Sequence, residues 1–97
     1  MKIRFTPSAL LQFLEALSYI RRDKPLAAQR FRERAEKILR RLEKHPESGR
    51  LIPEFPDLPH REVIITPYRF FYRLEKKTVW NIGLWHGAQE VQLPESV

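Results

Sequence analysis

The chain has 97 residues, contains no cysteine and carries a formal net charge of +6 at pH 7. This length suffices for one compact domain and is too short for two, so we expect residues 1–97 to form a single domain. The absence of cysteine excludes disulfides, thiolate metal sites and cysteine nucleophiles, and it is typical of the reducing cytoplasm.

Metal sites and membrane segments also leave recognisable patterns in a sequence. His45, His60 and His86 are scattered without a metal-ligand spacing, and we expect neither a metal nor a cofactor. No apolar stretch has the length of a membrane span or the position of a signal peptide. The sequence therefore predicts a cytoplasmic protein that makes no use of a membrane.

Two helices are predicted over about residues 7–44. The first begins at Thr6 or Ser8 with Pro7 in its first turn, and the second begins at Pro25 and ends near Lys44. Apolar residues recur at intervals of three and four and give each helix one stripe: Leu10, Phe13, Leu14, Leu17 and Ile20 on the first, and Phe31, Ala35, Ile38, Leu39 and Leu42 on the second. Because the link between them is short, the helices should form an antiparallel hairpin.

The positive charge is concentrated in residues 21–50, which hold eleven Lys and Arg residues against five Asp and Glu residues, a difference equal to the whole net charge of +6. Such a field suggests a polyanionic target or an acidic partner. The alternative is a solvated helix face, on which the i,i+4 pairs Glu33–Lys37 and Glu36–Arg40 support the second helix.

Residues 60–86 predict a three-stranded antiparallel meander. A β-branched run over Val63–Thr66 is followed by an alternating run over Tyr68–Glu75 and by a third run over Val79–Trp85, with an irregularity expected at Gly83. Alternation places two sets of side chains on opposite faces of the middle strand: Tyr68, Phe70, Tyr72 and Leu74 on one, and Arg69, Phe71, Arg73 and Glu75 on the other.

A short strand over Lys2–Phe5 precedes the helices, and a proline-rich loop over residues 45–60 follows them. The predicted order is β-α-α-β-β-β. This is an α+β fold in which the helical hairpin packs on one face of an antiparallel sheet. The other face is then left for function.

Several stretches, in this order and spacing, resemble the RelE/ParE superfamily of toxins from type II toxin–antitoxin modules: Leu17–Ile20 with Pro25–Ala28, Pro46–Arg50 with Pro53–Glu54, Arg61–Glu62, Tyr68–Tyr72, and Trp85–Ala88. The likeness covers roughly residues 3–91. It implies a RelE/ParE-like fold and a small basic protein that halts growth unless a cognate antitoxin binds it. We expect an acidic, partly disordered antitoxin segment to lie across the helical hairpin and the sheet.

The superfamily has two branches with different targets. RelE-like and YoeB-like toxins cleave mRNA in the ribosomal A site, whereas ParE-like toxins inhibit DNA gyrase and are not known as nucleases. Cleavage through the 2′-hydroxyl needs a base, an acid and cations that stabilise the phosphorane. By position, Glu54, Arg69 and His86 resemble the YoeB-type base, cation and acid.

Four further residues are candidates for binding the target. Arg50, Arg61 and Arg73 are suited to phosphate contacts, and Phe71, between two arginines on an open strand, suits a stacked base or a partner's helix. Each candidate has a structural alternative. Arg69 and Arg73 can simply lie on a solvent-exposed face of the sheet, and Glu54 can pair with Arg61 or Arg50. His86 can be a hydrogen-bonded residue at the end of a strand.

The C-terminal end of the resemblance separates the two branches. YoeB-like enzymes have a tyrosine at the position of Gly87, and the lysine-rich cluster of RelE-like enzymes is missing. The sequence of this stretch is therefore more similar to ParE-like members. Against this, Gln89 and Glu90 stand where ParE-like chains usually have arginine. Strict alternation also places His86 on an apolar face, unless a bulge at Gly83 returns it to the open face.

Three functional hypotheses follow, in order of preference. The first is a ParE-like inhibitor of DNA gyrase, and the second is a ribosome-dependent endoribonuclease that acts on mRNA. The third is an interaction domain without toxic activity.

Overall fold

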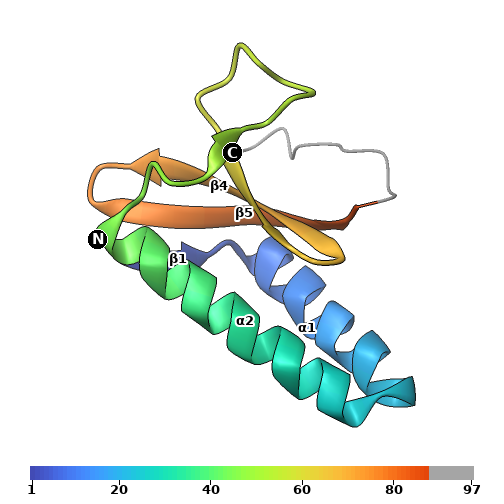
Figure 1. Ribbon diagram of the computed structural model, residues 1–97. Coiled ribbons are helices and arrows are strands. Elements are labelled where there is room, and N and C mark those ends of the chain that lie inside the picture. The colour runs from blue at the N-terminus through green and yellow to red at the C-terminus, as the bar shows by residue number, and fades with distance from the viewer. Residues whose placement is uncertain (88–97) are drawn as a thin grey trace.

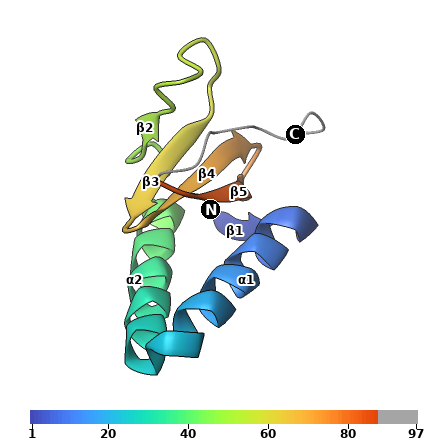
Figure 2. The same cartoon turned by 90° about the vertical axis from the view of Figure 1, so that its right-hand side faces the viewer.

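The computed structural model describes residues 1–87. In chain order its elements are β1 (Lys2–Phe5), α1 (Pro7–Asp23), α2 (Pro25–Lys44), β2 (Arg50–Leu51), β3 (Arg61–Ile65), β4 (Tyr68–Glu75) and β5 (Thr78–His86). Both helices lie on one side of a five-stranded sheet, and the segment between β2 and β3 rises from the other side (Figures 1 and 2). The predicted α+β fold and its helical hairpin are therefore confirmed.

The sheet has the strand order β1-β5-β4-β3-β2 and is mixed. The strands β2 to β5 pair antiparallel, whereas β1 pairs with β5 in parallel, with Ile3 opposite Val79. The expectation of an antiparallel sheet is wrong at this edge, because the helical hairpin returns the chain before the meander begins and β5 then runs in the direction of β1. The two-residue strand β2 also lies inside the segment expected to be a loop.

Local chemistry explains where the helices begin. The side-chain hydroxyl of Thr6 accepts a hydrogen bond of 3.2 Å from the backbone N–H of Ala9, and Pro7 occupies the first turn of α1. Lys24 joins the two helices directly. Among residues 1–87, no helix is both long enough and apolar enough to cross a membrane.

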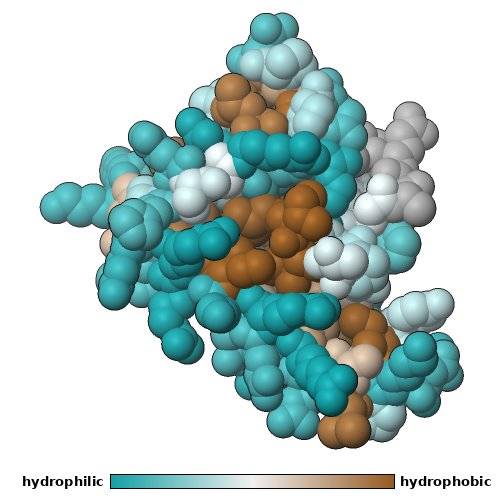
Figure 3. Space-filling model, in the orientation of Figure 1, coloured by the Kyte–Doolittle hydropathy of each residue, from teal (hydrophilic) through white to brown (hydrophobic). Residues whose placement is uncertain are grey.

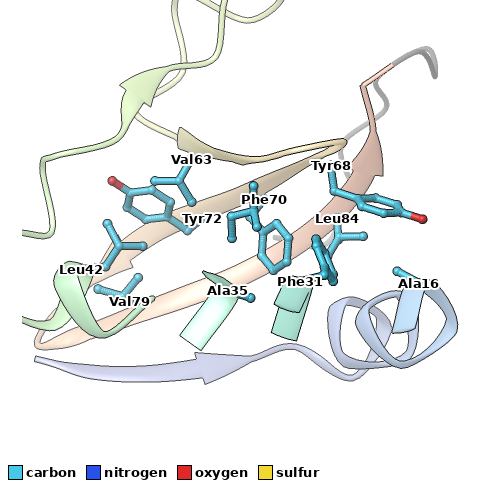
Figure 4. Close-up of a cluster of buried hydrophobic side chains, with 11 residues drawn as sticks. Ala16, Phe31, Ala35, Leu42, Val63, Tyr68, Phe70, Tyr72, Val79 and Leu84 are labelled. Carbon is cyan, nitrogen blue, oxygen red and sulfur yellow. The ribbon is translucent and has the colours of Figure 1, made fainter. Parts of the chain in front are cut away.

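The main core lies between the helices and the sheet (Figure 4). Its members are Ala16, Phe31, Ala35, Leu42, Val63, Ile65, Tyr68, Phe70, Tyr72, Val79 and Leu84. Phe31 of α2 packs against Tyr68 and Phe70 of β4, with ring centroids 5.3 and 6.3 Å apart. The predicted inward face of β4 is thus confirmed from Tyr68 to Tyr72.

The stripe predicted for α1 is correct only in part. Leu10 and Leu14 are 45% and 53% exposed, while Ala9 and Ala16 are buried. The small side chains let the backbone of α1 approach its neighbours closely, and this turns the two leucines toward solvent. α1 therefore presents apolar surface that the fold does not cover.

Candidate functional site

The sheet face opposite the helices was expected to be open, but the chain covers it with a second, smaller core. Ile52, Phe71 and Ile82 are fully buried there, with Phe55, Trp80 and Trp85 packed around them. Two of these six residues, Ile52 and Phe55, come from the loop over residues 45–60. Phe71 therefore offers no exposed ring to a base or a partner helix, because a two-sided sheet in so small a protein has to shield both faces.

Arg69 lies at the rim of this second core, held between two carboxylates. Its terminal nitrogens Nη1 and Nη2 donate to the two oxygens of Glu54, both at 2.7 Å, and its Nε donates to Oε1 of Glu62 at 2.8 Å. The guanidinium also stacks on Phe71, with Cζ 5.2 Å from the ring centroid. Glu54 and Arg69, two of the three proposed catalytic residues, are thus brought together as a bidentate ion pair.

This pairing changes the acid–base character of both residues. The hydrogen bond from Arg69 lowers the pKa of Glu54 to about 2. The hydrogen bond to Glu54, followed by those to Glu62, raises the pKa of Arg69. At neutral pH the pair therefore consists of a weakly basic carboxylate and a cation whose charge is already balanced.

Glu62 connects two of the candidate residues, Arg50 and Arg69, although sequence reasoning named it only as part of the resemblance and gave it no role. Its side chain is fully buried at the start of β3, and its second oxygen accepts a hydrogen bond of 2.5 Å from Nε of Arg50. Arg61, in contrast, donates to the backbone carbonyl of Gly49 at 2.8 Å. The available signal was an acid directly before the apolar run Val63–Ile65 of the strand, since a buried carboxylate requires cationic partners.

The segment over Pro46–Arg50 is fixed to the sheet by the phenol of Tyr72. The hydroxyl donates to the carbonyl oxygen of Pro46 at 2.7 Å and accepts from the N–H of Gly49 at 3.0 Å. Burial is the first cause of the raised pKa of Tyr72. A Cβ on Gly49 would lie 2.5 Å from this hydroxyl and 2.6 Å from the carbonyl oxygen of Glu62, so only glycine fits here.

His86 lies on the other side of the sheet from the Arg69–Glu54 pair. The pairing of β4 with β5 shifts by one residue, so that Phe71 faces Gly83 while Tyr72 faces Asn81. The predicted irregularity near Gly83 is therefore present, but its effect is opposite to the one expected. His86 is directly opposite Tyr68 on the helix side, where the two rings meet edge to face with centroids 5.4 Å apart.

Arg73, the last candidate, is held at the end of the second core. Its Nη1 bonds the carboxylate of Glu75, and its buried Nε has no partner among residues 1–87. The positive charge of Arg73 contributes to the lowered pKa of His60. Among residues 1–87, neither ring nitrogen of His60 has a hydrogen-bond partner. In this part of the chain, no three His, Asp or Glu side chains gather as a metal site would require.

One of two comparisons with known proteins supports this fold. A comparison with curated proteins finds no match. Residues 3–91 match the family model described as ParE toxin of type II toxin-antitoxin system, parDE. This range includes both helices, all of the sheet except Lys2, and every candidate residue named above. The chain therefore belongs to the ParE toxin family of type II toxin–antitoxin systems.

Proposed function

We propose that this protein halts growth by binding and inhibiting DNA gyrase, without cleaving RNA. The observation that carries the proposal is the position of His86 on the opposite side of the sheet from Arg69 and Glu54. An acid and a base that act on one phosphodiester need to reach it at the same time. Here the sheet separates them. The proposed target also places the protein in the cytoplasm.

The state of the remaining pair supports the same proposal. A carboxylate with a pKa of about 2 is a poor acceptor for the proton of a 2′-hydroxyl at neutral pH. Arg69 uses Nε, Nη1 and Nη2 on two carboxylates of its own chain, which leaves little of its charge for a phosphorane. These features are those of a structural ion pair that holds a loop to a sheet.

The test is a gyrase supercoiling assay with the wild-type protein and the variants His86→Ala and Glu54→Gln. Both side chains are exposed enough for the variants to fold. We expect all three proteins to block supercoiling with similar potency, because neither residue performs catalysis. Gyrase that remains fully active with the wild-type protein would overturn the proposal.

We also propose where the cognate antitoxin binds. Figure 3 shows an apolar area between α2 and the sheet, surrounded by hydrophilic side chains. Leu10, Leu11 and Leu14 add exposed apolar surface on α1, and the chain carries a net charge of +6. An acidic segment with apolar residues complements both features. The double variant Leu10→Glu/Leu14→Glu should escape neutralisation by the product of the neighbouring reading frame, and unchanged neutralisation would exclude α1 from the interface.

A further inference from the structure

From Arg30 to the end of α2, one flank of the helix carries a row of cations, which the exposed Leu26 precedes by one turn. The residues Arg30, Arg34, Lys37, Arg41 and Lys44 follow one another at intervals of four, three, four and three, so they share one flank of the helix, and all five are exposed. We call this set the basic flank. At 1.5 Å per residue it extends over about 21 Å. Glu36 and Glu43 lie on a different flank, together with Arg32.

The acids of α2 do not neutralise the basic flank. The expected pairs Glu33–Lys37 and Glu36–Arg40 are absent from the described structure. Instead, Glu36 pairs with Arg32 at 3.1 Å, and Glu33 accepts a hydrogen bond of 3.3 Å from Gln29. Neither acid therefore pairs with a member of the basic flank.

The cations themselves have almost no partners. Within residues 1–87, no member of the basic flank forms an ion pair, and only Arg34 makes a side-chain hydrogen bond, to the carbonyl oxygen of Thr66 at 3.0 Å. A hollow of about 330 Å³ lies along the C-terminal half of the flank, and it is lined by Lys37, Arg40, Arg41 and Lys44 together with the half-buried Ile38. Unpaired cations around a hollow can accept oxyanions from outside the chain.

The flank offers few anchors to a protein partner. Its one strongly exposed apolar side chain within residues 1–87 is Leu26, at the N-terminal end of α2. Farther along the helix, Phe31 and Leu42 are buried and Ile38 and Leu39 are half-buried. Protein interfaces derive most of their affinity from buried apolar and aromatic anchors. Contacts with a phosphate backbone need only cations, and Arg and Lys supply most of them.

We propose that the basic flank binds the phosphate backbone of duplex DNA without regard to sequence. Three of its five members are arginines, whose planar guanidinium groups donate two hydrogen bonds to one phosphate. The choice of DNA rests on the proposed function, because gyrase acts on duplex DNA. The toxin then contacts the DNA that its target protein holds, and this raises the local concentration of toxin at gyrase.

The test is fluorescence anisotropy of a labelled duplex of about 20 base pairs, titrated with the full chain in the absence of gyrase over about 50 to 200 mM salt. Each phosphate contact contributes about 0.9 to the slope of log K against log salt, so five cations predict a slope of about −3 to −5. The variant Lys37→Glu/Arg41→Glu should weaken binding at least about tenfold and reduce the slope by about 2. Far-ultraviolet circular dichroism checks that each variant remains folded.

The matched control is Arg21→Glu/Arg22→Glu, which reverses two exposed cations on α1 and changes the net charge equally. It should leave DNA binding within about threefold of the wild type, since screening limits charge effects to about 10 Å. If both double variants lose the same affinity for the duplex, net charge alone explains the loss, and the proposal is overturned. A competition experiment adds polyglutamate at the same concentration of negative charges as the duplex. If polyglutamate displaces the duplex, the flank binds acidic protein segments and the proposal is overturned.

This measurement is independent of gyrase inhibition. A wild-type protein that blocks supercoiling but does not bind the duplex would refute the DNA contact alone. A protein that binds the duplex through the basic flank but leaves gyrase active would refute the proposed function alone.

Discussion

Glu54 and Arg69 form a bidentate ion pair in which both N–O distances are 2.7 Å. The pair joins the loop between β2 and β3 to the middle of β4. Behind it, the buried carboxylate of Glu62 accepts a third hydrogen bond from the same guanidinium. Two residues that resemble catalytic groups in sequence therefore serve, in this fold, to hold a loop over the second core.

The contribution of Glu54 to stability should depend on pH. Its folded-state pKa of about 2 lies below its usual value of 4.5, so the contribution is fully present above pH 4.5 and is lost as the pH falls toward 2. Because the Glu54 side chain is 43% exposed, we expect Glu54→Gln to cost only about 0.5 to 1 kcal/mol at pH 7. Urea denaturation at several pH values measures this. The cost should vanish by about pH 2, and a cost independent of pH would contradict the assignment.

Glu62 should contribute more to the stability of the fold than the exposed carboxylates do. Glu62→Gln removes the charge that Arg50 and Arg69 share, and breaking a buried ion pair costs about 3 kcal/mol or more. The matched control is Glu75→Gln, which removes an exposed carboxylate and should cost less than about 1 kcal/mol. Equal midpoints of chemical denaturation for the two variants would show that the buried network does not stabilise the fold.

Gly49→Ala should destabilise the protein for a steric reason. The added Cβ would meet the Tyr72 hydroxyl at 2.5 Å and the backbone of Glu62 at 2.6 Å, so the Pro46–Arg50 segment has to move away from the sheet. We expect a loss of about 2 to 3 kcal/mol, as for other overpacked sites. Ser48→Ala, at the exposed neighbouring position, is the control and should be nearly neutral. A thermal midpoint for Gly49→Ala equal to that of the control would refute this close contact.

His60 should make the protein less stable in mild acid. Burial, and then the charge of Arg73, lower the pKa of His60 below its usual 6.5 in the folded state. The unfolded chain therefore takes up the proton first, and stability falls as the pH drops below about 6.5. His60→Leu should lose less stability than the wild type between about pH 7 and 5. Parallel curves of stability against pH for the two proteins would contradict the burial of the ring nitrogens of His60.

Local periodicity was sufficient to predict most of the fold. The apolar stripe of α2 and the inward face of β4 could be predicted because each has a regular spacing of apolar residues. The parallel pairing of β1 with β5 could not be predicted, because it joins segments more than 70 residues apart and leaves no local signal in the sequence. Periodicity also overlooked the alanines that bring α1 close to its neighbours.

The candidate site was harder to predict than the fold, for two physical reasons. Alternation assigns Phe71 to a face but does not indicate that Ile52 of a distant loop will cover it. One extra residue in β5 reverses every later side chain, so His86 lies on the opposite face from Trp80 and Ile82. Both of those residues belong to the second core, and their apolar character alone does not indicate which face of the sheet they join. Arg69 and Glu54 were named as candidates from the sequence, and their catalytic role stays a prediction; no role was given to Glu62, which also bonds Arg69.

The central claim is that this toxin acts on gyrase and not on mRNA. The most direct test adds the wild-type protein to a purified translation reaction, maps the 5′ ends of the mRNA, and measures gyrase supercoiling on the same sample. Intact mRNA together with blocked supercoiling is the predicted result. New mRNA ends in phase with codons, with supercoiling unaffected, would contradict it and would return Glu54, Arg69 and His86 to catalytic roles.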